Sequence, residues 1–289
     1  MSLFIPPQPT LAEAWVETLR EVHDAGGTAT NVLTTVSTPG LEQHAAFREA
    51  YDRHIFRHTR KGNEIYRAET VANTIFPEAL YHRPDGLWTV GDSDRFEAAE
   101  DAFYARFLKN YSMLKRAARA NQRGTYFGRL VCWDSGKGEP VNQLKVRIAA
   151  LREAQRRQRP IRTWNAFDFS LGDEGLVTAE ESPPGMQMYQ PGDHRTLSQR
   201  GFPCMVHVDL SLVRGRINLT GVYRHQYVIT KGYGNLLGLA RLQAFIAQQS
   251  GFDVGELSVL GTYSDDERKG TWNKTLATQI LADTSAALA

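Results

Sequence analysis

The sequence lacks the features that mark disulfide-bonded, membrane-spanning and nucleic-acid-binding proteins. Among its 289 residues only Cys132 and Cys204 are cysteines, which predicts no disulfide framework and fits a reducing compartment. No apolar run approaches the ~20 residues of a membrane-spanning helix, and we expect no signal peptide. The 34 basic and 32 acidic side chains give a net charge of +2. We therefore expect a soluble cytoplasmic protein with neither a membrane nor a nucleic-acid partner.

The pattern of apolar residues predicts an α+β protein. We expect one domain over residues 1–289, with an insertion or loop at 163–184, where glycine, proline and acidic residues gather. Helical periodicity and end signals predict helices at 10–23, 44–56, 69–76, 96–119, 144–157 and 235–249. Strands are predicted at 32–36 and 185–189, and a β-hairpin at 205–213 and 216–227.

One face of the predicted hairpin is strongly apolar, with Val206, Val208, Leu210 and Leu212 alternating with polar residues. Such a face needs a cover, which is either a second copy of the chain or the chain's own helices. We expect a homodimer and keep the second cover as the alternative.

Cys204 is the candidate nucleophile. It follows Pro203 at the start of a predicted strand, a place where a cysteine alone more often serves packing. Arg200 precedes it, and Arg224 is expected from the partner strand of the hairpin. Nearby positive charge stabilises a thiolate, the reactive form of cysteine. Cys132 has an apolar setting and is interpreted as structural.

Four short motifs occur at specific spacings. Cys204 closes the sequence GFPC, Arg224 follows 20 residues later, Asn235 follows 11 residues after that, and AQQ occupies residues 247–249. This arrangement resembles the core of the thymidylate synthase superfamily over residues 185–262. The resemblance implies that family's fold, a mixed β-sheet flanked by helices, in a homodimer that packs sheet against sheet.

The resemblance also implies a chemistry. A thiolate of Cys204 would add to C6 of a pyrimidine nucleoside monophosphate and make C5 nucleophilic enough to take a one-carbon unit from methylene-tetrahydrofolate. Arg224 would bind the phosphate, and Asn235 would hydrogen-bond the pyrimidine edge. Glu69 resembles the catalytic glutamate, which moves protons through water. Tyr126 opens a segment similar to the family's Tyr-Gly active-site strand, and residues 142–144 resemble a helix start.

Several positions depart from the pattern of an ordinary thymidylate synthase. The histidine and tyrosine that hold the sugar fall at Asp265 and Glu267, the serine after the phosphate arginine is His225, and the folate-contacting aspartate falls at Tyr227. The arginines that a second subunit lends are missing or displaced to residues 156–162. These departures resemble the hydroxymethylase branch, which acts on CMP, dCMP or dUMP. The expected nucleotide-binding residues are Arg224, Asn235, Tyr126, Arg200, His225 and Asp265.

Simpler interpretations stand beside these. Glu69 is also typical of an acid at a helix N-terminus, Arg224 of a surface ion pair, and Asn235 of a helix cap. The leading hypothesis is a pyrimidine nucleotide C5 hydroxymethylase that needs no metal. The alternatives are a thymidylate synthase that methylates dUMP, or a nucleotide-binding or regulatory protein without catalysis. The base, the sugar and the product stay open.

Overall fold

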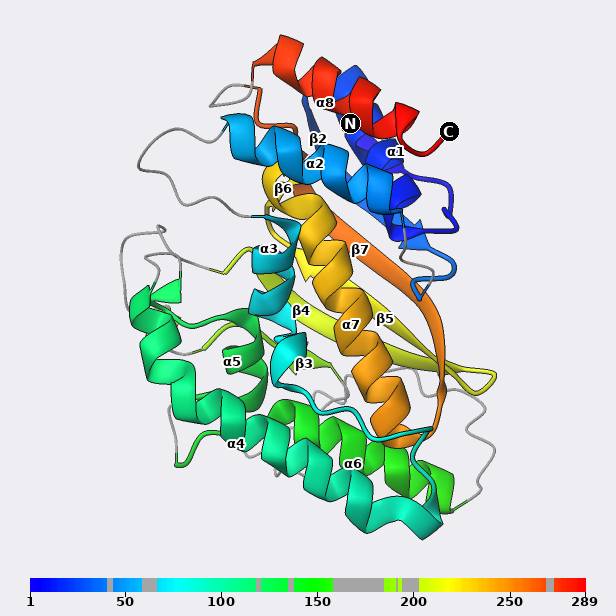
Figure 1. The fold of residues 1–289 in the computed structure, drawn as a ribbon, viewed down its shortest axis with the longest axis vertical. Coiled ribbons are helices and arrows are strands. Elements are labelled where there is room, and N and C mark those ends of the chain that lie inside the picture. The colour runs from blue at the N-terminus through cyan, green and yellow to red at the C-terminus, as the bar shows by residue number, and fades with distance from the viewer. Residues whose placement is uncertain are drawn as a thin grey trace. The chain divides into compact units, whose positions relative to one another are not determined.

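The computed structural model has a mixed α+β architecture in which helices flank an open, mixed β-sheet (Figure 1). It describes residues 1–40, 44–58, 67–117, 121–134, 138–157, 185–190, 192–193, 203–268 and 273–289. The insertion or loop predicted at 163–184 lies outside these residues. None of the helices in the described ranges is long and apolar enough to span a membrane.

The chain divides into two compact units. Unit 1 comprises Met1–Phe76, Thr220–Arg241 and Gly255–Ala289, and unit 2 comprises Pro77–Leu219 and Leu242–Val254. The prediction of a single domain over residues 1–289 stays a prediction.

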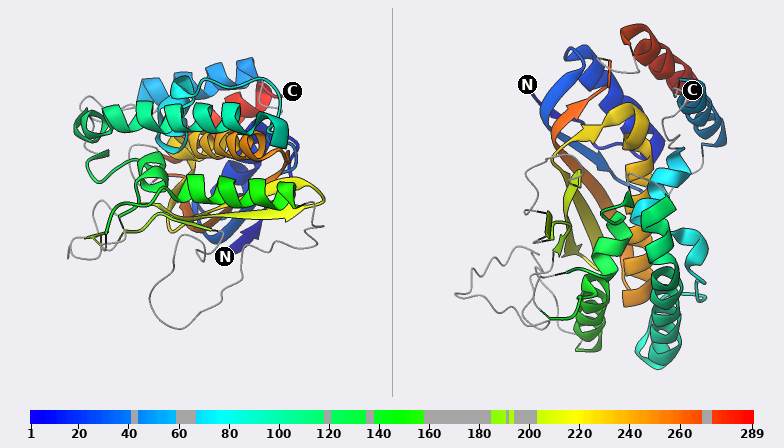
Figure 2. Two further views of the ribbon diagram at one scale, coloured as in Figure 1. Left: turned by 90° about the horizontal axis from the view of Figure 1, so that it is seen from below. Right: turned by 90° about the vertical axis from the view of Figure 1, so that its left-hand side faces the viewer.

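Unit 1 contains the first and last strands of the chain. Its elements are β1 (Ser2–Phe4), α1 (Leu11–Asp24), β2 (Thr28–Val36), α2 (Ala45–His58), α3 (Ala68–Ile75), β6 (Gln226–Tyr227), the π-helical turn η5 (Val228–Gly232), the first half of α7 (Tyr233–Ser250), most of β7 (Asp253–Asp265) and α8 (Lys274–Ala286). β2 pairs parallel with β1 and antiparallel with β7, and β6 pairs parallel with β7. α1 packs on β2, and α8 packs against α1 and α2 (Figures 1 and 2).

Helix α1 forms as its sequence predicts. Thr10 is the N-cap, and its side chain accepts a hydrogen bond from the backbone of Glu13 while the Glu13 carboxylate accepts one from the backbone of Thr10. This capping box satisfies two donors that a helix start leaves unpaired. One face of the helix is apolar and buried, since Leu11, Trp15, Leu19 and Val22 are at most 1% exposed. This face anchors the helix on the sheet.

Unit 2 is rich in helices. Its elements are the short 3₁₀ turns η1 (Glu78–Leu80) and η2 (Val90–Asp92), α4 (Ser93–Ala117), α5 (Tyr126–Val131), α6 (Gln143–Arg156), β3 (Met186–Gln187), β4 (Met205–Val213), the first half of β5 (Arg216–Tyr223) and the second half of α7. The strand order is β5-β4-β3, and β3 runs antiparallel to β4. α5 packs against α4, α6 and β3. Asn142 caps α6 through a bond from the backbone of Lys145, which confirms the predicted helix start.

The β4–β5 hairpin is confirmed, with one change. Arg214 and Gly215 both have positive φ, 51° and 76°, which is the backbone of the two-residue turn that joins twisted antiparallel strands. The second arm, however, ends at Tyr223 rather than Tyr227. Residues 226 and 227 leave the hairpin because they take β7 as their partner and form β6.

The apolar face of the hairpin is covered within the single chain. Val208, Leu210 and Leu212 are 0%, 7% and 6% exposed, and Val206 is half-buried. The chain itself therefore supplies the cover that the sequence requires. The apolar face therefore no longer supports a homodimer, and the homodimer stays a prediction.

Residues 126–128, which resemble a strand of the thymidylate synthase superfamily in sequence, begin helix α5. The reason is local. Thr125 has an extended backbone, and its hydroxyl accepts a hydrogen bond from the backbone N–H of Gly128 at 3.1 Å. A threonine in that arrangement is an N-cap and starts a helix.

Candidate functional site

The residues predicted for the site fall into both units. Unit 1 holds Glu69, Arg224, His225, Asn235 and Asp265, and unit 2 holds Tyr126 and Cys204. Arg200 lies outside the described residues, so its role stays a prediction.

In unit 2, Tyr126 holds the backbone on both sides of Cys204. Cys204 is a half-buried free thiol directly before β4. The backbone N–H groups of Cys204 and Met205 both donate to the Tyr126 hydroxyl, at 3.2 Å each. Burial of that hydroxyl raises the pKa of Tyr126 well above its usual value, and the nearby Cys204 raises it further. The hydroxyl therefore stays neutral, and its two hydrogen bonds hold the backbone from which the Cys204 side chain extends.

In unit 1, Glu69 is held by two arginines. Its carboxylate accepts two hydrogen bonds from Arg241, at 2.6 and 3.1 Å, and one from Arg48 at 3.2 Å. The bonds from Arg241 are the largest cause of a lowered pKa for Glu69, and Arg48 lowers it further. Glu69 is thus an ionised, paired carboxylate. Glu69 is therefore not an unpaired acid at a helix N-terminus, as the simpler interpretation had it. The two arginines disfavour uptake of a proton by its carboxylate.

The sequence did not point to the two arginines. Arg48 also bonds Asp52, four residues along α2, at 3.0 Å, and this i,i+4 spacing was a readable signal. Arg241 is 172 residues from Glu69 in the chain and carries no such signal.

Asn235 is almost buried and lacks a protein partner. It is 4% exposed, and its side chain makes no hydrogen bond within the described ranges of the chain. It is the third residue of α7, which begins at Tyr233, so it does not cap that helix. Its amide atoms are not among the fully buried side-chain atoms that lack a partner, so they reach solvent and can hydrogen-bond a ligand or water.

The turn before α7 determines where Asn235 lies. The carbonyls of Val228 and Ile229 in η5 accept bonds from Trp15 Nε1 at 2.7 Å and from the Tyr51 hydroxyl at 2.8 Å. The backbone N–H and hydroxyl of Thr230 donate to Glu267 at 2.7 and 2.8 Å. Burial of its carboxyl group raises the pKa of Glu267 to about 7. Glu267, expected near the sugar, therefore braces this turn.

His225 and Asp265 are brought together by the structure. His225 Nε2 lies 2.7 Å from Asp265 Oδ2. The imidazole stacks on Tyr227, with ring centroids 4.2 Å apart, and meets the Tyr263 ring edge-on at 5.0 Å. Arg224 precedes His225 and is half-buried, and its backbone carbonyl accepts a bond from the Thr262 hydroxyl at 3.0 Å.

The arginines considered as displaced phosphate ligands are engaged elsewhere in unit 2. Arg156 pairs with Glu97 at 3.4 Å and lies over the Trp88 ring, and Arg157 pairs with Glu153 at 2.6 Å. Both guanidinium groups are thus paired with carboxylates at the end of α6 and on α4. Arg159 and Arg162 lie outside the described residues.

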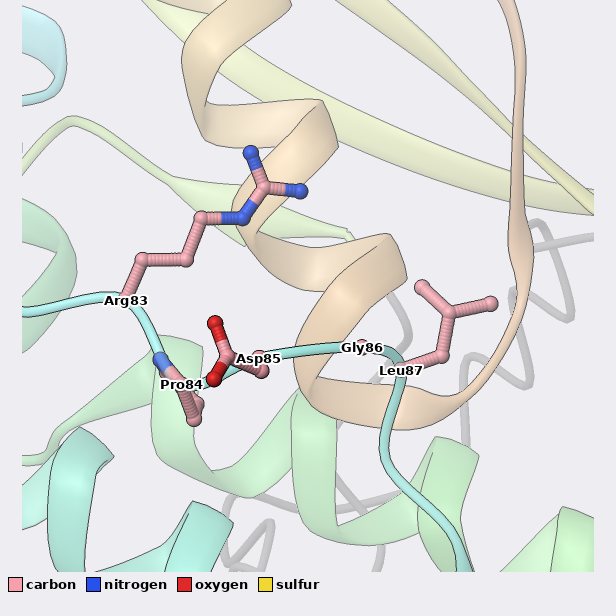
Figure 3. A pocket seen from close by; sticks show the side chains of 5 residues that line it. All are labelled: Arg83, Pro84, Asp85, Gly86 and Leu87. Carbon is pink, nitrogen blue, oxygen red and sulfur yellow. The ribbon is translucent and has the colours of Figure 1, made fainter.

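A surface depression of about 530 Å³ lies elsewhere in unit 2, lined by Arg83, Pro84, Asp85, Gly86 and Leu87 (Figure 3). None of the residues predicted for the site lines it. Across the described ranges, no three histidine, cysteine or acidic side chains gather in a way that could hold a metal ion.

Comparison with models of protein families and with curated proteins finds no match to this chain. The resemblance to the thymidylate synthase superfamily therefore rests on the residues and spacings of the sequence itself.

The ion pairs of Glu69 predict a pH-dependent effect on stability. A carboxyl whose pKa is lowered in the folded protein stabilises it above the unfolded pKa, near the ordinary 4.5, and loses that contribution as pH falls through the lowered value. Glu69→Gln should therefore lower the free energy of unfolding at pH 7 by at most about 1 kcal/mol, since the side chain is 45% exposed. Urea denaturation should show this difference shrinking below pH 4.5. A difference that is constant from pH 7 to pH 3 would contradict the ion-pair explanation.

Proposed function

We propose that the protein is a pyrimidine nucleotide C5 hydroxymethylase, which transfers a one-carbon unit from methylene-tetrahydrofolate to CMP or a related nucleoside monophosphate. The observation that carries this proposal is Asn235, a residue only 4% exposed whose amide reaches solvent and makes no hydrogen bond within the described chain. It occurs at the position that matches the pyrimidine-reading asparagine of the family that the sequence resembles, 31 residues after Cys204 and 11 after Arg224.

An amide suits the edge of a pyrimidine because it both donates and accepts hydrogen bonds. Cytosine presents an acceptor at N3 and a donor at C4, and uracil presents the reverse pair. An asparagine meets either base by turning its amide over. The proposal therefore covers both cytosine and uracil nucleotides.

Cys204 supplies the covalent step of the proposal. Its thiolate forms a bond to C6, and the electron pair of the C5–C6 double bond moves toward the C4 substituent, so that C5 becomes nucleophilic. The contact of Tyr126 with the two amides beside Cys204 supports this role, because a nucleophile must be held in place to act efficiently.

Arg224 is proposed to bind the phosphate, where a guanidinium makes charge-assisted hydrogen bonds. Such an anchor adds to the chemistry by restricting the position of C6. The residue after it supports a hydroxymethylase over a methylase, since His225 is joined to Asp265 at 2.7 Å where the methylase pattern has serine and histidine.

A nucleotide-binding protein without catalysis is the second candidate, and one observation favours it. The carboxylate of Glu69 is neutralised by Arg241 and Arg48, whereas proton transfer to the pyrimidine needs a carboxyl group that can take up and release a proton.

The first prediction from this proposal concerns exchange at C5. The protein, given methylene-tetrahydrofolate, should release tritium from at least one of C5-labelled CMP, dCMP, UMP and dUMP, and the product mass should show an added hydroxymethyl group. Cys204→Ala should reduce release to background because no adduct forms. Cys132→Ala is the matched control and should retain release. Binding without release from any of the four nucleotides would favour the second candidate.

The second prediction concerns Asn235. Replacing it by leucine removes an amide that makes no hydrogen bond within the described chain, so the melting temperature should change little. Nucleotide binding, measured by calorimetry, should weaken at least about tenfold, as expected for loss of hydrogen bonds worth about 1.4 kcal/mol or more. A marked loss of stability with unchanged nucleotide affinity would show that Asn235 is structural.

A further inference from the structure

Helix α4 of unit 2 exposes one long face that is largely apolar. Its opposite face is packed through Phe103 and Phe107, which are 0% and 1% exposed. Both of these rings contact Phe127 of α5, with centroids 5.0 and 4.8 Å apart. The exposed face carries Ala98, Ala102, Ala105, Leu108, Ser112 and Met113. Leu108 and Met113 are 42% and 57% exposed, whereas the outer face of a surface helix is normally polar. Such a face needs a cover.

The charges beside this apolar face are divided between the two halves of α4. Asp94 and Asp101 are exposed on the first half, and Lys109 and Arg116 are exposed on the second. After Asp101 the helix contains no further acidic residue. In the described part of the chain, Asp94, Lys109 and Arg116 form no ion pair. Asp101 pairs with Lys145 at 2.5 Å, but both side chains are more than half exposed, so this pair is weak.

The helix dipole explains only part of this division. An acid in the first turn and a base in the last turn complement the partial charges of the helix ends, and the effect fades within one turn. Asp94 and Arg116 meet that condition. Asp101 and Lys109 lie more than one turn from either end and do not. Arg95, the one basic residue of the first half, is paired with the last residue of η2 at 3.4 Å.

The two halves become complementary when a second α4 lies antiparallel to the first. Residues at equal distances from the midpoint of the pair then face one another. A midpoint at Ala105 places Asp94 opposite Arg116, since both are eleven residues from it. The same midpoint places Asp101 opposite Lys109, since both are four residues from it. A two-fold axis through the midpoint repeats each pair, as in the common symmetric dimer.

We propose that two copies of the chain associate through the exposed faces of their α4 helices, which run antiparallel with Ala105 at the two-fold axis. The apolar side chains exclude water from the centre of this interface, and the repeated ion pairs beside them fix its direction and register. The interface is formed by helices, so it differs from the packing of sheets that the family resemblance implies. The inference does not depend on the proposed function.

Sedimentation of the whole chain tests the role of the charges. The unmodified chain should show a monomer–dimer equilibrium at micromolar concentration. Arg116→Asp should weaken association at least about tenfold, because it places an acid against the partner's Asp94. Adding Asp94→Arg should restore association, and both changes oppose the helix dipole, so the rescue cannot come from a more stable α4. Arg216→Asp is the matched control, because it makes the same change of charge at an exposed position of β5, and it should leave association unchanged.

A cysteine at the proposed axis tests the register. In a chain with Cys132→Ala and Cys204→Ala, Ala105→Cys should form a disulfide-linked dimer on mild oxidation, because the two copies of residue 105 face one another. Ala98→Cys is the matched control on the same exposed face. Its two copies would be about 20 Å apart along the helices, so it should form no such dimer.

Circular dichroism should show that each variant keeps the helical content of the unmodified chain. A chain that stays monomeric at its highest soluble concentration would overturn the proposal. A dimer that Arg116→Asp leaves intact would also overturn it, and would favour packing of sheets instead. Equal cross-linking at positions 98 and 105 would contradict the antiparallel register and with it the proposed interface.

Discussion

The position of the first turn of α7 depends on the hydrogen bonds that the backbone groups of η5 make with other segments. A π-helical turn departs from the regular helical pattern and is frequently found at functional positions. Here the partners come from three separate segments of unit 1, with Trp15 and Tyr51 donating to two carbonyls and Glu267 accepting from Thr230. Because these bonds fix the first turn of the helix, they also fix the place of the Asn235 amide.

The end of β7 contributes to the same arrangement through three consecutive carboxylates. Asp265 orients His225, Asp266 bonds Arg268 and lies 2.9 Å from His23 of α1, and Glu267 holds Thr230. Glu267 adopts a positive φ of 58°, which turns the chain so that neighbouring side chains reach different elements. A short acidic segment thereby sets the positions of an imidazole and a helix start.

Local patterns in the sequence predicted the fold well, and long-range contacts limited the prediction of the site. The helix at 10–23 and the hairpin at 205–227 were predicted from local signals and both form, the helix with a capping box at Thr10 and the hairpin with a turn at Arg214 and Gly215. The end of β5 was misplaced because residues 226 and 227 pair with a strand about 38 residues further along the chain. Alternation of polar and apolar residues does not reveal such a change of partner.

In the candidate site, too, local patterns were readable in the sequence and long-range contacts were not. Cys204, Arg224 and Asn235 were selected because their spacing resembles that of a known family, yet Glu69 is bonded by Arg241, which lies 172 residues away in the chain. No local pattern connects them, and the lowered pKa follows only from the folded arrangement. Residues 126–128 resemble a strand of a known family but begin a helix, and the N-cap at Thr125 was the local signal for that helix.

The proposed function requires that Cys204 form a covalent bond to C6 of a pyrimidine nucleotide. Fluorine at C5 cannot leave as a proton does, so a 5-fluoropyrimidine nucleotide should stop the reaction at the covalent adduct in the presence of methylene-tetrahydrofolate. Mass spectrometry of the intact protein should show the chain with both molecules added, and peptide mapping should place them on Cys204. A nucleotide that binds at saturating concentration and leaves the protein mass unchanged would contradict the account.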